Sequence, residues 1–486
     1  MNNHFKKPNK FDRNLIVIGA GSAGLVSSYI AAAVKAKVTL IEKHLMGGDC
    51  LNTGCVPSKA LIRSAKILAQ SKRASEFGFK RIEVEFDFAE VMQRIQRVIS
   101  TIEPHDSMQR YTELGVECIQ GEARITSPWS VEVNGQSLTT RSIIIATGAR
   151  PFVPPIPGIA EMDYLTSDNI WQITDLPRRL VVLGGGPIGS ELTQCFARFG
   201  SEVSQVEMLP RILMREDPEV SEILKRQFEK DGVKVLVEHT AKLFKKAGDQ
   251  KIIVCEKDGK EIEIEFDALL VAVGRKPNIS GFGLEDLDVP INKPGTIQTN
   301  AYLQTVYPDI FACGDVAGPY QFTHTAAHQA WYASVNALFG RFKKFKVDYS
   351  VIPWATFTDP EVARVGLNET DAKEQGIKYE VSLYGIDDLD RAITDEEAHG
   401  FVKVLTVPGK DKILGATIVG EHAGELITEY ISAMRHGLGM NKILGTIHIY
   451  PTLSEANKFA AGVWKKAHAP QGLLKVVEWF HKIQRG

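Results

Sequence analysis

The sequence predicts an α/β protein with two Rossmann-like domains and a C-terminal α+β domain. Three observations predict this fold class. A strand, glycine-rich turn, helix and strand follow one another twice, apolar strand-like runs return after each copy, and the pattern changes near residue 347 to strands followed by helices. The chain has 486 residues, which at roughly 150 residues per domain is enough for about three domains.

The composition is that of an ordinary globular protein. Hydrophobic residues make up 44% and charged residues 24%, and 57 Lys and Arg against 59 Asp and Glu give a net charge of −2. This balance predicts no nucleic-acid partner, and without a run of ~18 apolar residues no integral membrane segment is predicted. The polar N-terminus lacks the apolar centre of a secretion signal, and six cysteines suit a reducing compartment, so we expect a cytoplasmic protein.

The first copy of the repeated pattern begins at residue 15. A strand-like run leads into Gly19, Gly21 and Gly24, a helical stretch follows to residue 34, and a second strand ends at Glu42. In this arrangement the first glycine permits a tight turn, the second lets the backbone approach a pyrophosphate, and the third lets helix and strand pack closely. Because the acid can accept hydrogen bonds from a ribose, this copy predicts a dinucleotide site.

The second copy has the same layout. A strand-like run leads into Gly184, Gly186 and Gly189, followed by a helix to residue 199 and a strand that ends at Glu207. The acid follows the third glycine by 18 residues in both copies (42 − 24 and 207 − 189). One such turn is weak evidence, but two copies with matching acids predict two dinucleotide sites rather than glycine-rich turns without a ligand.

Two further runs indicate the domain boundaries. Residues 143–148 and 269–274 are apolar strands that end in glycine, and a proline-rich linker follows the first of them. We therefore expect one dinucleotide domain to be inserted into the other. The predicted domains are residues 1–148 with 277–346, the inserted residues 149–276, and residues 347–486, in which strands near residues 400–419 precede helices.

The most informative segment is G-G-D-C-L-N-T-G-C-V-P-S-K at residues 47–59. It directly follows the first dinucleotide pattern, where it would open the next helix. Cys50 and Cys55 can form a disulfide if the turn is distorted, which Gly54 permits. A helix N-terminus also lowers the pKa of a thiol and favours the reactive thiolate. The alternatives are a structural disulfide, which the reducing compartment argues against, and two buried thiols, which the adjacent nucleotide site argues against.

The remaining cysteines stand apart from this segment. Cys118, Cys195, Cys255 and Cys313 lie in apolar surroundings and are predicted to be core residues. No second pair of Cys or His at ligand spacing accompanies the dithiol, so no metal site is predicted.

With these motifs the chain resembles the class I FAD-dependent pyridine nucleotide-disulfide oxidoreductases, which include dihydrolipoamide dehydrogenase, mercuric reductase and glutathione reductase. The resemblance covers residues 12–458 and also rests on Thr147-Gly148, on residues 311–315 and on residues 357–366. It implies that the first domain binds FAD, that the inserted domain binds NAD(P), and that the third domain joins two copies in a homodimer.

The resemblance also implies roles for single residues. Cys55 would exchange electrons with the flavin, Cys50 would exchange with a small-molecule or protein disulfide or dithiol, and Lys59, paired with Glu191, would lie near the reactive flavin nitrogen. The FAD-binding residues that it implies are Gly19, Gly21, Ser22, Ala23, Gly24, Glu42, Lys43, Gly48, Lys59, Ala123, Thr147, Gly148, Gly314, Asp315, Thr323 and His324. Those for the nicotinamide dinucleotide are Gly184, Gly186, Ile188, Gly189, Glu207 and Gly274.

Glu207 predicts which nicotinamide dinucleotide is used. An acid at this position accepts a hydrogen bond from the free 2′-hydroxyl of NAD and repels the 2′-phosphate of NADP. NADH is therefore predicted to be preferred over NADPH. Arg211 is the opposing feature, because its side chain could reach a phosphate.

The main departure from the family lies at residues 447–455. In dihydrolipoamide dehydrogenase the residue before the proline of this segment is a histidine, the acid/base of thiol chemistry, oriented by a glutamate five residues later; here these positions are Tyr450 and Glu455. The resemblance places both beside the partner subunit's Cys50. The ordinary pKa of a phenol is about 10, so Tyr450 is a poor base near neutrality, although it can donate a hydrogen bond or a proton. His448 is the rival base, but we expect it to be a structural histidine.

Three functions are compatible with these observations. The first is a dihydrolipoamide dehydrogenase-like oxidoreductase acting on a disulfide or dithiol. The second is a mercuric-reductase-like reductase of a metal ion or other non-disulfide acceptor, since that family also has an aromatic residue before the proline. Two features argue against the second function: no cysteine follows Cys313 to form a C-terminal pair, and no metal-capture module is expected at the N-terminus. The third is a flavoprotein component of an assembly or a redox sensor. Residues 471–485 are expected to form a helix docked on its own domain, with a membrane surface or a partner as alternatives.

Overall fold

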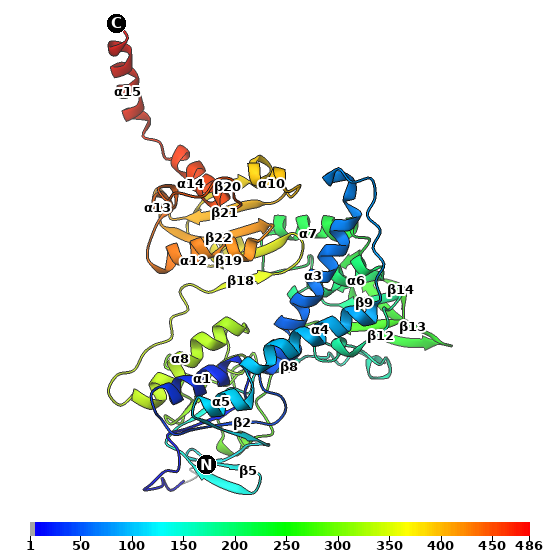
Figure 1. Cartoon of the computed structure of the whole chain (residues 1–486), viewed down its shortest axis with the longest axis vertical. Helices are drawn as coiled ribbons and strands as arrows, with labels where there is room; N and C mark the ends of the chain where they lie inside the picture. The colour runs from blue at the N-terminus through cyan, green and yellow to red at the C-terminus, as the bar shows by residue number, and fades with distance from the viewer. Residues whose placement is uncertain (1–4) are drawn as a thin grey trace. The chain divides into compact units, whose positions relative to one another are not determined.

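The structure, a computed structural model, describes residues 5–486, which form two compact units (Figure 1). The first unit holds the chain up to residue 69 together with residues 83–208 and 232–348, and the second holds residues 70–82, 209–231 and 349–486. Both glycine-rich turns and the two cysteines of the dithiol segment therefore belong to the first unit.

A parallel five-stranded sheet of the first unit carries the first glycine-rich turn. Its order is β17-β7-β1-β2-β3, and its strands are β1 (Leu15–Ile18), β2 (Val38–Glu42), β3 (Val116–Gln120), β7 (Ile143–Ile145) and β17 (Ile310–Ala312). The central strands are buried on both faces, which explains their unbroken runs of Ile, Leu and Val. Helix α1 (Ser22–Ala33) packs against α8 (Thr323–Phe339). The other elements are α2 (Gly48–Asn52), α3 (Cys55–Lys72), α4 (Phe88–Ile102), α5 (Met108–Glu113) and an antiparallel sheet of β4 (Arg124–Ser127), β5 (Ser130–Val133) and β6 (Gln136–Thr139).

A second parallel sheet of the same unit repeats the arrangement. Its order is β11-β10-β9-β15, and its strands are β9 (Arg179–Leu183), β10 (Glu202–Glu207), β11 (Lys234–Val237) and β15 (Ala268–Val271). Helix α6 (Pro187–Phe199) follows β9 as α1 follows β1, which is the repeat that the sequence predicts. An antiparallel sheet of β12 (Thr240–Ala247), β13 (Gln250–Lys257) and β14 (Lys260–Phe266) accompanies it.

A two-stranded antiparallel pair forms between the segment that follows β7 and the segment that follows β15. It consists of β8 (Ala149–Pro151) and β16 (Arg275–Pro277), with Lys276 opposite Arg150. The proposed domain boundaries fall within this pair, at the start of β8 and the end of β16. We keep these boundaries as a proposal.

The second unit contains an antiparallel sheet covered by helices. Its order is β18-β19-β22-β21-β20, from β18 (Pro353–Thr356), β19 (Glu361–Gly366), β20 (Glu380–Gly385), β21 (Phe401–Thr406) and β22 (Ile413–Gly420). The sequence pattern indicated only β21 and β22, whose residues are all buried except the half-buried Leu414. The helices are α7 (Pro218–Lys230), α9 (Glu369–Glu374), α10 (Asp390–Thr394), α11 (Ala423–Leu426), α12 (Thr428–Arg435), α13 (Met440–Leu444), α14 (Glu455–Ala467) and α15 (Gln471–Gln484).

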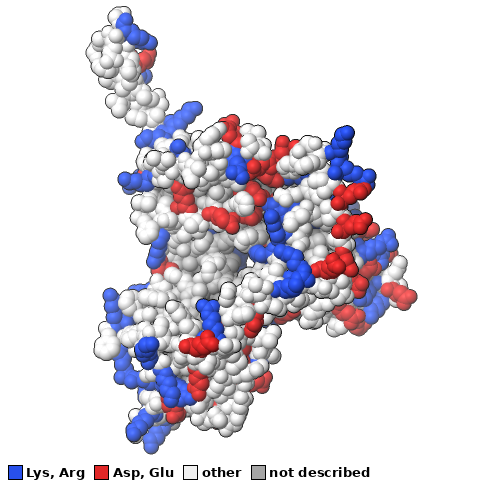
Figure 2. Space-filling view, viewed as in Figure 1, with Lys and Arg blue, Asp and Glu red and all other residues white. Residues whose placement is uncertain are grey.

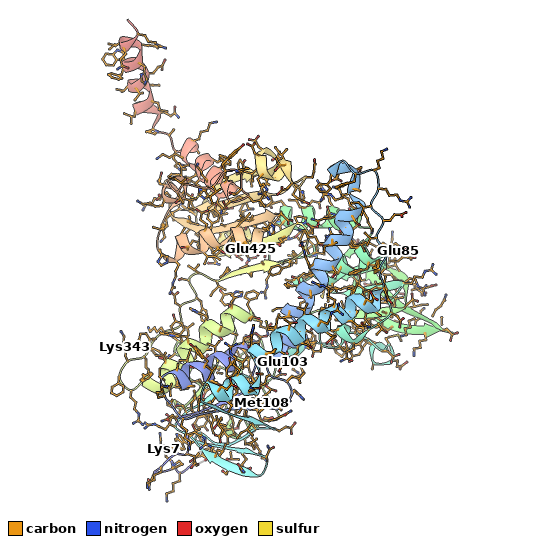
Figure 3. All side chains as sticks on the ribbon, in the orientation of Figure 1. Lys7, Glu85, Glu103, Met108, Lys343 and Glu425 are labelled. Carbon is orange, nitrogen blue, oxygen red and sulfur yellow. The ribbon has the colours of Figure 1, made fainter. Side chains whose placement is uncertain are left out.

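The last helix, α15, corrects one expectation. It forms at the predicted residues, but none of its side chains is buried, so it is not docked on its own domain. In Figure 3 its side chains extend from the helix without meeting another element. Within residues 5–486, no helix combines the length and the apolar character needed to cross a membrane.

Candidate active site

The dithiol segment folds into two consecutive helices. Cys50 lies in α2 and Cys55 is the first residue of α3. The segment thus opens a long helix, as the sequence predicts, but the short helix that holds Cys50 was not expected. Cys50 is half-buried, Cys55 is exposed, and the two are not joined by a disulfide. The Trp171 indole donates a hydrogen bond to the Thr53 carbonyl at 2.8 Å, which holds the turn between the two helices.

The two sulfurs share one proton. A hydrogen bond from the Cys50 thiol lowers the pKa of Cys55 to about 6, and the Thr323 hydroxyl, 3.3 Å from Cys55 Sγ, and the Lys59 ammonium act in the same direction. The same hydrogen bond and burial raise the pKa of Cys50. The N-terminus of α3 also favours negative charge at its first residue. Near neutral pH the reduced pair is therefore a Cys50 thiol beside a Cys55 thiolate.

An ion pair supports this thiolate from α3 and α6. Lys59 Nζ, one turn beyond Cys55, lies 3.1 Å from Glu191 Oε2. The Glu191 side chain is 7% exposed and that of Lys59 is 36% exposed. The pairing implied by the family resemblance is thus present, and the carboxylate fixes the position of the ammonium.

Replacing Lys59 with methionine should raise the pKa of Cys55, because the positive charge that favours its thiolate is lost. In the unmodified reduced protein the thiolate is present above pH about 6 and is lost as the pH falls through that value. The loss should occur at higher pH in Lys59→Met. The measurement is the pH dependence of Cys55 alkylation by iodoacetamide, followed by mass spectrometry.

The same variant should lower the free energy of unfolding by about 1–3 kcal/mol, because Glu191 keeps a buried carboxylate without this cation. Arg63→Met, an exposed cation one turn further along α3, is the matched control and should change neither quantity. An unchanged alkylation profile in Lys59→Met would show that the ammonium does not act on Cys55.

The glycines of both turns explain why this backbone can approach a ligand. A Cβ at Gly24 would lie 1.7 Å from the carbonyl oxygen of Gly19, and one at Gly189 would lie 2.2 Å from that of Gly184. Close packing of helix and strand therefore requires the third glycine in each copy. A Cβ at Gly186 would meet nothing within 4 Å, so packing does not account for this glycine. The open space at the N-terminus of α6 fits a pyrophosphate.

The acid of each copy closes its turn in the same way. Glu42 Oε2 accepts a hydrogen bond from the Ala20 amide at 2.6 Å, and Glu207 Oε2 accepts one from the Gly185 amide at 2.6 Å. Both acids end the second strand of their pattern, where a ribose is expected. The residues present therefore fit a dinucleotide in each copy.

Arg275 is a site residue that the sequence reasoning missed. Its guanidinium bonds to the Asp49 carboxylate, beside Cys50, and its Nε lies 3.7 Å from Asp315 Oδ2. Burial raises the pKa of Asp315 to about 6, and the arginine opposes this shift. The only sequence signal was the position of Arg275 directly after Gly274. Arg275 thus connects the dithiol helix to the predicted FAD residue Asp315.

The other predicted cofactor residues lie on the same set of elements. The Thr147 hydroxyl donates to the Asn278 carbonyl at 2.7 Å, and a Cβ at Gly314 would lie 3.2 Å from that of Ala23. His324 stacks on Phe322 at the start of α8. Gly48 begins α2, and a Cβ on it would lie 2.6 Å from the Gly21 Cα. The remaining predicted residues lie at the ends of strands and helices: Ser22 begins α1, Lys43 follows β2, Ala123 is buried before β4, Gly148 follows β7, Ile188 is in the first turn of α6, and Gly274 follows β15.

In the second unit, Tyr450 is bonded to a residue that the resemblance did not indicate. Its hydroxyl donates a hydrogen bond to Asp390 Oδ2 at 2.8 Å, and this bond raises the pKa of the phenol. Glu455 is buried and accepts a hydrogen bond from the Thr452 amide at 3.3 Å. Asp390 therefore acts on Tyr450, and sequence spacing gave no indication of it, because Asp390 is 60 residues away.

His448 has the contacts expected of a structural histidine. Its Nε2 lies 3.0 Å from Glu429 Oε1, its Nδ1 lies 3.0 Å from the Thr446 carbonyl, and its side chain is 5% exposed. Both ring nitrogens thus face acceptor atoms, which leaves neither directed at a substrate.

Three of the four remaining cysteines are core residues, as predicted. Cys195, Cys255 and Cys313 are buried, and burial raises the pKa of these thiols to about 12, 11 and 12. Cys118 is half-buried, and burial raises the pKa of its thiol as well. The shifts oppose thiolate formation, in contrast to Cys55.

Comparison with known proteins identifies the family. Residues 13–330 match the family described as pyridine nucleotide-disulphide oxidoreductase, and residues 352–461 match its dimerisation domain. The chain belongs to this family. It is therefore an FAD flavoprotein oxidoreductase that uses a pyridine nucleotide and carries a domain for dimerisation.

Relatives with two different names are about equally similar. Mercuric reductase from Staphylococcus aureus is 35% identical over 455 residues, covering 94% of this chain and 83% of that protein. Dihydrolipoyl dehydrogenase from Chlamydia muridarum is 34% identical over 446 residues, covering 90% of this chain and 94% of that protein. These identities do not distinguish the two activities.

Solved structures agree with the family assignment. The HOCl-induced flavoprotein disulfide reductase RclA from Escherichia coli has a TM-score of 0.82 at 27% identity, covering 92% of this chain and 99% of that one. LpdA from Mycobacterium tuberculosis has a TM-score of 0.83 at 25% identity, again covering 92% and 99%.

Proposed function

We propose that this oxidoreductase works as an NADH-dependent reductase, which passes electrons through Cys50 and Cys55 to a disulfide or other soft acceptor. The observation that carries the proposal is the thiol–thiolate pair at the start of α3, with Cys55 held as a thiolate and Cys50 as a thiol. When bound, FAD supplies the electron transfer that links the nicotinamide to the dithiol.

The chain's own groups account for the thiol chemistry on a disulfide acceptor. Cys55 thiolate first accepts the proton of Cys50, the Cys50 thiolate attacks one acceptor sulfur, the acceptor S–S bond breaks, and that proton passes on to the leaving sulfur. Cys55 thiolate then attacks Cys50, which forms the Cys50–Cys55 disulfide and releases the second acceptor sulfur. No external base is needed in this direction, because the Cys55 thiolate deprotonates Cys50; the single proton of the pair goes to the first leaving sulfur, and the second leaves as a thiolate.

The Tyr450–Asp390 pair supports reduction of a disulfide substrate rather than oxidation of a dithiol substrate. Oxidising a dithiol substrate requires a base that removes thiol protons, and a phenol whose pKa is raised by a carboxylate is a poor base near neutrality. The phenol can instead donate a hydrogen bond to the second acceptor sulfur, which leaves as a thiolate. We further propose that Tyr450 and Glu455 meet the partner subunit's Cys50 in a homodimer, and that the protein is cytoplasmic.

The proposal is tested by a screen of NADH-dependent acceptor reduction. The FAD-loaded protein is given NADH with lipoamide, glutathione disulfide, quinones or mercuric ion, and in a parallel assay NAD with dihydrolipoamide. Reduction of a disulfide faster than oxidation of dihydrolipoamide supports the proposal. Oxidation of dihydrolipoamide as the faster reaction contradicts it.

Reduction of a metal ion is the second candidate. The aromatic residue before the proline, Tyr450, favours it, as does the similarity to mercuric reductases. A soft metal ion held by two sulfurs needs no base at all. In the same screen, turnover of mercuric ion without turnover of disulfides would select this function.

The preference for NADH should weaken when the charge of Glu207 is removed. In Glu207→Gln the ratio of kcat/KM for NADH to that for NADPH should fall about tenfold, because the repulsion of the 2′-phosphate is lost. Arg211 does not favour NADPH by itself, since its guanidinium donates to the carbonyls of Met214 and Glu216 at 3.3 and 3.2 Å.

Glu202→Gln is the matched control for this variant. Glu202 is an exposed acid at the other end of β10, and its loss should leave the ratio unchanged. A preference of the unmodified protein for NADPH would contradict the assignment.

A further inference from the structure

Helix α15 is a segment that the oxidoreductase function leaves unexplained. It begins at Gln471, beyond the last residue matched by the dimerisation domain, 461. None of its residues is buried, and its large side chains are exposed, with Trp479 at 63%, Ile483 at 56% and Phe480 at 51%. A cluster of exposed apolar side chains of this kind usually marks an interaction surface.

The helix has two distinct faces. At about 100° per residue, six of the seven large apolar side chains fall within an arc of about 160°, from Trp479 at one edge to Val477 at the other, and Leu474 lies about 60° beyond Val477. The six residues within the arc are Leu473, Val476, Val477, Trp479, Phe480 and Ile483. The opposite side carries the charged residues, and Figure 2 shows the helix as mainly uncharged with its cations along one side.

The charged face is cationic. It contains Lys475, Lys482 and Arg485 against Glu478, which pairs with Lys482 at 2.8 Å. Two further lysines, Lys465 and Lys466, end the preceding helix α14. Basic residues on the polar face, with Trp and Phe on the apolar face, are typical of helices that lie in the interface of an anionic membrane.

Two other occupants fit less well. The apolar arc is wider than the narrow seam of a two-stranded coiled coil, and 14 residues supply only about two heptads, so pairing with a second copy of α15 is disfavoured. At 1.5 Å per residue the helix is about 21 Å long, which is less than the ~30 Å hydrocarbon core that a spanning helix must cross. A position parallel to the surface satisfies both faces.

We propose that α15 is a peripheral membrane anchor that binds anionic lipid surfaces. Its apolar face enters the boundary between headgroups and acyl chains, and its lysines and arginine contact lipid phosphates. The oxidoreductase is thereby held at a lipid surface, independently of which acceptor it reduces.

The test is flotation of the full-length, FAD-loaded protein with vesicles. Vesicles of phosphatidylcholine with phosphatidylglycerol should carry the protein, and vesicles of phosphatidylcholine alone should carry about tenfold less. Trp479→Glu/Phe480→Glu should reduce flotation about tenfold or more. Lys475→Glu/Lys482→Glu should reduce it selectively on the anionic vesicles and at low salt.

Glu478→Gln is the matched control on the polar face and should float at least as well as the unmodified protein. All variants should keep NADH oxidation with an acceptor that draws electrons directly from the flavin, since none of the α15 residues is buried and none belongs to the dithiol segment. No flotation, or equal flotation on both vesicle types, overturns the proposal. A change of oligomeric state in Trp479→Glu/Phe480→Glu without vesicles also overturns it and assigns α15 to contact between copies.

Discussion

Replacing Cys50 with serine is expected to lower NADH-driven reduction of a disulfide acceptor by roughly 10³-fold or more, because the sulfur that attacks the acceptor is removed. The serine hydroxyl can still donate a hydrogen bond to Cys55, so the Cys55 thiolate should persist below its ordinary pKa. The measurements are steady-state acceptor reduction and the pH dependence of Cys55 alkylation in the same variant.

Electron transfer to an acceptor that reacts directly with the flavin should survive in Cys50→Ser. Cys118→Ser is the matched control, because Cys118 lies on β3 and its pKa is raised rather than lowered. The control should retain full activity with both acceptors. Disulfide reduction by Cys50→Ser at the unmodified rate would show that the acceptor bypasses the dithiol.

Much of the fold and of the dithiol site can be predicted from the sequence because their determinants are local. The first and third glycine and the acid lie within a segment of 24 residues (19–42 in the first copy), and their spacing alone defines a strand, turn and helix. That the dithiol segment opens the next helix follows in the same way from its place after the first pattern. The family resemblance then supplied the long-range pairing of Lys59 with Glu191.

The interactions that escaped prediction join distant parts of the sequence. Arg275 and Asp49 are 226 residues apart, and neither has a periodicity that indicates the other. The resemblance drew attention to Glu455, five residues after Tyr450, but gave no indication of Asp390, to which the phenol donates its hydrogen bond. The amphipathic pattern of α15 required its apolar face to be covered, but a pattern on one helix does not say what covers it.

Replacing Tyr450 with histidine is expected to increase oxidation of dihydrolipoamide by roughly 10²-fold or more, since a positioned general base contributes about this much. A neutral imidazole removes a thiol proton near pH 7, whereas the Asp390 carboxylate keeps the phenol protonated. Steady-state NAD reduction with dihydrolipoamide measures the gain, and the FAD content of each variant verifies folding.

Three companion variants separate the base from its surroundings. Tyr450→Phe keeps the ring without a titratable group and should show no gain. Asp390→Asn should bring the pKa of Tyr450 closer to its ordinary value, which is still too high for a base, so it should show no gain either. If Glu455 orients the new imidazole, Tyr450→His/Glu455→Gln should lose most of the gain. If the Tyr450→His protein binds FAD normally but does not oxidise dihydrolipoamide faster, residue 450 does not reach the substrate. The direction of the reaction would then be set by residues other than the Tyr450–Asp390 pair.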